Sequence, residues 1–155
     1  MDIRKLWRTA LLTHILVLSA NLSAQTITLT FTTTKVNADT ISITQSSGQK
    51  VVATHYKGTS KVSFSDGRKT TSTVSCIYMT QSEDQSFHVK GLCNVDAGKN
   101  GSFGILTRCN FTNKERTETD CWGKMHGETG SYKGRHGISS WHQKGDISTG
   151  TGQWY

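Results

Sequence analysis

The dominant pattern along this chain is an alternation of apolar and polar residues with a period of two. Residues 26–32 read T-I-T-L-T-F-T, which places Ile27, Leu29 and Phe31 on one face and threonines on the other. The same alternation returns in residues 71–79 and 103–111. Because neighbouring side chains of a β-strand point to opposite faces, this pattern predicts strands with one buried face. Nothing after residue 24 shows the three-to-four-residue apolar repeat of a helix.

Turn signals separate the predicted strands. Asp66-Gly67 and Asn100-Gly101 are typical of tight hairpin turns, and residues 113–120 (NKERTETD) predict a solvated loop. The last 35 residues contain regularly spaced glycines, at positions 123, 127, 130, 134, 137, 145, 150 and 152. About eight short strands joined by such turns predict an all-β domain. We expect an antiparallel eight-stranded up-and-down barrel, with a β-sandwich as the alternative.

The N-terminus has the layout of a secretory signal peptide. Three basic residues within the first eight precede an apolar run, residues 10–20, and small residues follow up to Ala24. A spanning helix needs about 20 apolar residues, so this run is too short for a permanent anchor. We expect a helical signal peptide over residues 1–24 and a single mature domain over residues 25–155. The mature protein is then secreted or periplasmic, with no membrane span after signal removal.

All four cysteines lie in the predicted mature domain, at Cys76, Cys93, Cys109 and Cys121. An even number of cysteines in an exported chain predicts two disulfides, and three pairings are open. The chain has no C-x-x-C pair, so we expect no structural metal site. The first three cysteines fall on the apolar faces of predicted strands. The bridges are therefore expected to point into the core.

Charge and motifs narrow the functional classes. The formal net charge is +7, and it falls to +5 when the predicted signal peptide is removed with its three basic residues and one acidic residue. The basic residues of the mature part are scattered without a polybasic run, so nucleic-acid binding is not expected. The sequence has no nucleophile elbow, phosphate-binding loop, zinc-protease helix or dinucleotide fingerprint, and no cofactor is expected.

One glycine-rich segment resembles a known superfamily. Residues 127–138, GETGSYKGRHGI, resemble the G-G-T-G-x-[YF]-x-G-x-x-G segment of allene-oxide-cyclase-like and dirigent-like barrels, and most of all small exported bacterial proteins that share it. Glu128 replaces the second glycine of that pattern, and the likeness extends loosely over residues 121–154. The resemblance implies an eight-stranded antiparallel barrel whose interior can hold a small apolar ligand. No catalytic residue of the plant enzymes is recognisable here, so none is transferred.

The leading functional hypothesis is a non-enzymatic exported barrel that binds a small apolar ligand or an envelope or host partner. Trp141 and Trp154 are the candidate ligand contacts, because aromatic side chains dominate apolar pockets, and packing of both in the core is the alternative. The enzymatic alternative is a barrel cyclase or isomerase, or a cationic ribonuclease-type hydrolase. It would use His126, His136 or His142 for proton transfer, and it requires two of them to approach each other in a pocket. These three histidines are also candidate ligand contacts.

Overall fold

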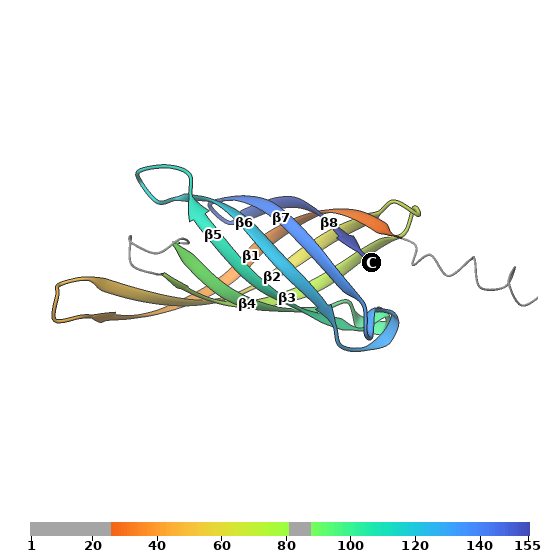
Figure 1. Ribbon diagram of the computed structural model, residues 1–155, viewed down its shortest axis with the longest axis horizontal. Coiled ribbons are helices and arrows are strands. Elements are labelled where there is room, and N and C mark those ends of the chain that lie inside the picture. Colours follow the sequence, from red (N-terminus) through yellow and green to blue (C-terminus); the bar gives the residue numbers. More distant parts are fainter. Residues whose placement is uncertain (1–25, 81–87) are drawn as a thin grey trace, which may run out of the picture.

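The computed structural model describes residues 26–80 and 88–155, so the predicted signal peptide lies outside the described residues. Eight antiparallel strands form a closed barrel in which each strand pairs with its neighbours in sequence and β8 closes onto β1 (Figure 1). The strands are β1 (Ile27–Thr44), β2 (Lys50–Phe64), β3 (Lys69–Thr80), β4 (Val89–Asp96), β5 (Ser102–Phe111), β6 (Glu118–Gly127), β7 (His136–Lys144) and β8 (Ile147–Trp154). Two short 3-10 turns, η1 (Gly98–Asn100) and η2 (Gly130–Tyr132), follow β4 and β6. The predicted barrel is confirmed, and the β-sandwich alternative is wrong because the sheet closes on itself.

The period-two pattern sorts residues between the interior and the outer surface as predicted. In β3, Val74 and Cys76 are buried, whereas Ile77 and Met79 are exposed. The predicted loop over residues 113–120 is too long, because β6 already begins at Glu118 and pairs there with β7. The first three residues of β6, Glu118 to Asp120, are polar on both faces of the strand. The apolar–polar alternation therefore could not show where this strand begins.

The hairpin of β1 and β2 extends beyond the rest of the barrel. Its ladder continues to the pair Thr44 and Lys50, whereas the pairing of β2 with β3 ends at Ala53. The tip therefore projects as a two-stranded arm (Figure 1). Ile41 and Ile43 are exposed on this arm.

Two disulfides join neighbouring strands inside the barrel. Cys76 bonds to Cys93 between β3 and β4, and Cys109 bonds to Cys121 between β5 and β6. Each bridge links residues that stand directly opposite each other in the antiparallel register. All four cysteines are buried. The prediction of two inward-pointing disulfides is confirmed, and the bridges connect the cysteines in sequential order.

The glycines of the segment between β6 and β7 allow a close approach of backbone to backbone. A Cβ atom on Gly127 would collide with the carbonyl oxygen of Tyr132. Gly130 has a φ of 59°, in the left-handed region that disfavours other residues, and it packs against the backbone of Asn100. This tight turn directs the Tyr132 side chain into the core, where only 4% of the residue is exposed. The glycine pattern therefore closes one end of the barrel.

Candidate functional site

The interior of the barrel is nearly filled. The cavity lined by the inward-facing side chains has a volume of about 60 Å³. That is room for a few water molecules, whereas sites for small organic ligands are typically about 300–1,000 Å³. An apolar ligand of ordinary size would enter this interior only if core side chains moved aside.

Both candidate tryptophans belong to this packed interior. Trp154 is only 1% exposed, and its ring lies 5.1 Å from the ring of Phe103 and 5.3 Å from that of Tyr132, measured between centroids. Trp141 packs beside the Cys109–Cys121 disulfide and is 8% exposed. Each tryptophan has a structural role in the core, which was the alternative interpretation of the sequence.

Two stacked tyrosines add a polar element to the interior without adding charge. The rings of Tyr56 and Tyr78 lie 5.5 Å apart between centroids. Burial raises the pKa of both hydroxyl groups, and the neighbouring Tyr56 raises the pKa of Tyr78 further. Both phenols are therefore neutral at physiological pH and offer no ionised base for catalysis.

A large concave surface lies on the outside of the barrel. It crosses β5, β6, β7, β8, β1 and β2 and has a volume of about 1110 Å³. We call it the outer groove. Its outward-facing residues are Thr28, Thr30, Ser63, Ser65, Leu106, Arg108, Trp122, Lys124, Ile138, Ser140, Thr151 and Gln153.

The outer groove combines large apolar side chains with cations. Leu106 is 56% exposed, Trp122 is 49% exposed and Ile138 is 46% exposed. In the strand register, Arg108 stands opposite Trp122, and Lys124 lies between Leu106 and Ile138. None of the residues that line this groove is acidic. The groove is thus suited to a ligand with both an apolar part and a negative charge.

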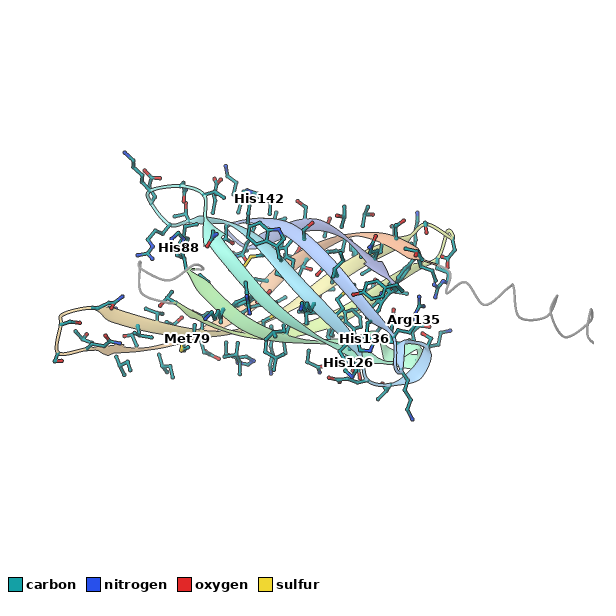
Figure 2. The ribbon with its side chains drawn as sticks, viewed as in Figure 1. Met79, His88, His126, Arg135, His136 and His142 are labelled. Atoms are coloured by element: carbon teal, nitrogen blue, oxygen red, sulfur yellow. A yellow bond between two sulfur atoms is a disulfide. The ribbon has the colours of Figure 1, made fainter. Side chains whose placement is uncertain are left out.

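His126 and His136 meet on the outer surface near η2. They stand opposite each other on β6 and β7, and their ring centroids are 5.0 Å apart. Figure 2 shows the two rings together at the end of the barrel marked by Arg135. Both residues are exposed, and neither lines the outer groove or the interior cavity.

His142 lies at the other end of β7, within a surface network of charges (Figure 2). Its Nδ1 atom is 2.8 Å from Asp120 Oδ1, and its Nε2 atom is 3.7 Å from Glu118 Oε2. The Lys144 ammonium donates to Glu118 at 2.8 Å. This hydrogen bond and the positive charge of Lys144 lower the pKa of Glu118. The network holds the His142 ring between two carboxylates.

The histidine arrangement differs from the one the sequence suggested. His136 and His142 both lie on the exposed face of β7. The close pair is His126 with His136, however, and the carboxylate of Asp120 beside His142 was not anticipated. The enzymatic hypothesis requires two histidines to approach in a pocket. Here the two histidines approach on an open surface.

The sequence comparisons assign this chain to no family. Neither the protein-family models nor the curated protein sequences give a match to this chain. The resemblance of residues 127–138 to allene-oxide-cyclase-like barrels therefore stays a prediction. Across the described ranges, no helix has the length and apolarity needed to cross a bilayer.

Proposed function

We propose that this protein is an exported, non-enzymatic binding protein whose outer groove holds an anionic amphiphile. By this we mean a lipid-like molecule with an apolar part and a phosphate group, of the kind present in envelope membranes. The observation that carries the proposal is the placement of Leu106, Trp122 and Ile138 beside Arg108 and Lys124, without an acidic residue in the groove.

The volumes favour the outer surface over the interior as the place of binding. The outer groove offers about 1110 Å³ and the interior cavity about 60 Å³. A ligand in the groove displaces only solvent, whereas a ligand in the interior would have to displace the packed rings around Trp154. Binding outside leaves the core intact and therefore costs less free energy.

The side chains of the groove match both halves of such a ligand. Large apolar residues that stay half exposed on a folded domain often mark interaction surfaces. The ring of Trp122 offers a broad apolar face together with a polar N–H group, a combination suited to the boundary between acyl chains and headgroups. Near an anionic lipid surface each lysine or arginine contributes about 1 kcal/mol of attraction. Arg108 and Lys124 would provide this electrostatic attraction.

Export agrees with the cysteine chemistry of the chain. Both disulfides are formed and buried, and such bridges persist in oxidising compartments outside the cytoplasm. The pattern of residues 1–24 points to the same route. An envelope location would bring the outer groove close to anionic lipids.

Sedimentation with lipid vesicles tests this proposal. We expect the protein to bind vesicles that contain phosphatidylglycerol, to bind pure phosphatidylcholine vesicles much more weakly, and to be released as salt is raised. Trp122→Ser should weaken binding about tenfold, because it removes apolar contact worth at least ~1.5 kcal/mol. Lys124→Glu should weaken binding mainly at low salt.

A matched control lies on the same barrel outside the groove. Ile77 on β3 is 60% exposed and does not line the groove, so Ile77→Ser should leave vesicle binding unchanged. Equal losses in Trp122→Ser and Ile77→Ser would show that exposed apolar residues act without regard to the groove. No binding to either kind of vesicle would contradict the proposal outright.

A further inference from the structure

We propose that His126 and His136 form a binding site for a divalent transition-metal ion such as Zn²⁺ on the outer face of β6 and β7. The inference does not rest on the ligand proposed for the outer groove, because neither histidine lines that groove. It rests on the backbone register, the distance between the rings and the exposure of both side chains.

The backbone brings the two histidines to the closest spacing that a β-ladder provides. His136 directs its N–H and C=O groups to Tyr155, on the side of β7 that faces β8. Its pair with His126 is therefore a non-hydrogen-bonded pair, in which the Cα atoms are about 4.5 Å apart and the side chains stand close together. The next pair along the ladder agrees, because Gly127 N–H donates to the carbonyl oxygen of Arg135.

The observed ring distance fits two imidazoles on one ion. A zinc ion lies about 2.0–2.1 Å from each imidazole nitrogen, so two such rings in tetrahedral geometry have centres roughly 5 Å apart. The rings of His126 and His136 are 5.0 Å apart between centroids and inclined at 45°, so they are not stacked face to face. Binding of a shared ion requires that one nitrogen of each ring turn toward it.

The ligand set predicts an open site. In the described part of the chain, no group of three or more His, Cys, Asp or Glu residues is arranged to hold a metal ion. The protein would thus supply two nitrogen ligands, and solvent would fill the remaining positions. Imidazole ligands suit Zn²⁺, Cu²⁺ and Ni²⁺, whereas Mg²⁺ and Ca²⁺ prefer oxygen. The site should therefore discriminate against the hard cations.

The third tail histidine provides a matched control. The ring nitrogens of His142 face two different carboxylates, Asp120 at 2.8 Å and Glu118 at 3.7 Å. His142→Ala removes an exposed histidine from the same strand without touching the His126–His136 pair.

Isothermal titration calorimetry of the purified, untagged protein with ZnCl₂ tests the inference. We expect one ion per chain and no comparable heat with MgCl₂. Loss of even an outer partner of a metal-ligating histidine costs roughly 10–100-fold in affinity, so His126→Ala and His136→Ala should each weaken binding at least about tenfold. His142→Ala should bind like the unmodified protein.

Imidazole ¹⁵N spectra give an independent readout that a change in folding would not mimic. Zn²⁺ should shift the ring nitrogens of His126 and His136 together and leave those of His142 in place. Absence of zinc binding at millimolar concentration would overturn the inference. So would equal affinity in His126→Ala and the unmodified protein, or loss of binding in His142→Ala.

Discussion

Replacement of Trp154 by alanine is expected to lower the free energy of unfolding by about 3–5 kcal/mol. Trp154 is 1% exposed and packs against Phe103 and Tyr132 at the end of the barrel that the glycine-rich turn closes. Its removal would leave a cavity that the surrounding strands cannot fill, because the hydrogen-bonded barrel resists local collapse.

Denaturant unfolding of Trp154→Ala and Trp122→Ala measures this effect with a matched control. Both variants remove an indole, but Trp122 lies on the outer surface and is 49% exposed. We expect Trp122→Ala to change stability by at most about 1 kcal/mol. Similar small losses in the two variants would mean that the interior is not packed as described, and binding inside the barrel would become the better hypothesis.

Removal of the Cys76–Cys93 bridge by a double substitution to alanine is expected to cost about 3 kcal/mol. The bridge closes a loop between residues separated by 17 positions, and its loss restores conformational freedom to the unfolded chain. The Cys109–Cys121 bridge spans 12 positions and should contribute slightly less. Since domains of this size are stable by only about 5–15 kcal/mol, loss of both bridges should bring the barrel close to unfolding.

Reduction of the unmodified protein provides the comparison for the double variants. With strong reductant, the unmodified protein should lose roughly the sum of the two single-bridge effects. Each double variant should lose only the effect of its remaining bridge. If reductant leaves the melting temperature of the unmodified protein unchanged, the bridges do not stabilise the fold and this interpretation fails.

The barrel could be predicted from the sequence because its physical basis is local. The alternation in residues 27–31 and 74–79 directly reflects which side chains point inward, and each strand pairs with its neighbour in the chain. The positions of Cys76, Cys93 and Cys109 on apolar faces correctly indicated inward-pointing bridges. Their pairing could not be derived, because it depends on the exact register between strands, which composition does not encode.

The sequence pattern could not predict features that depend on the register between strands or on the packing of side chains. The contact between His126 and His136 arises because the turn between β6 and β7 places residues ten apart in direct opposition. The same register brings Asp120 to His142. The volume left inside the barrel depends on how the rings around Trp154 interlock, and the strand pattern predicts only that they point inward.

The sequence contains a signal for the outer groove, but the period-two pattern does not predict it. Leu106, Trp122 and Ile138 are large apolar residues on the outward parity of their strands, each next to a buried neighbour. Strand alternation alone treats such residues as exceptions. Only the closed barrel shows that these exceptions lie together on one surface.

Amide and indole NMR spectra test most directly whether an anionic amphiphile binds in the outer groove. A short-chain phosphatidylglycerol, kept below its micelle concentration, would be titrated into ¹⁵N-labelled protein. Binding in the outer groove should shift the indole signal of Trp122 and the amide signals of Leu106 and Ile138, while the indole signals of Trp141 and Trp154 stay in place. Shifts of the two interior tryptophans without a shift of Trp122 would contradict it.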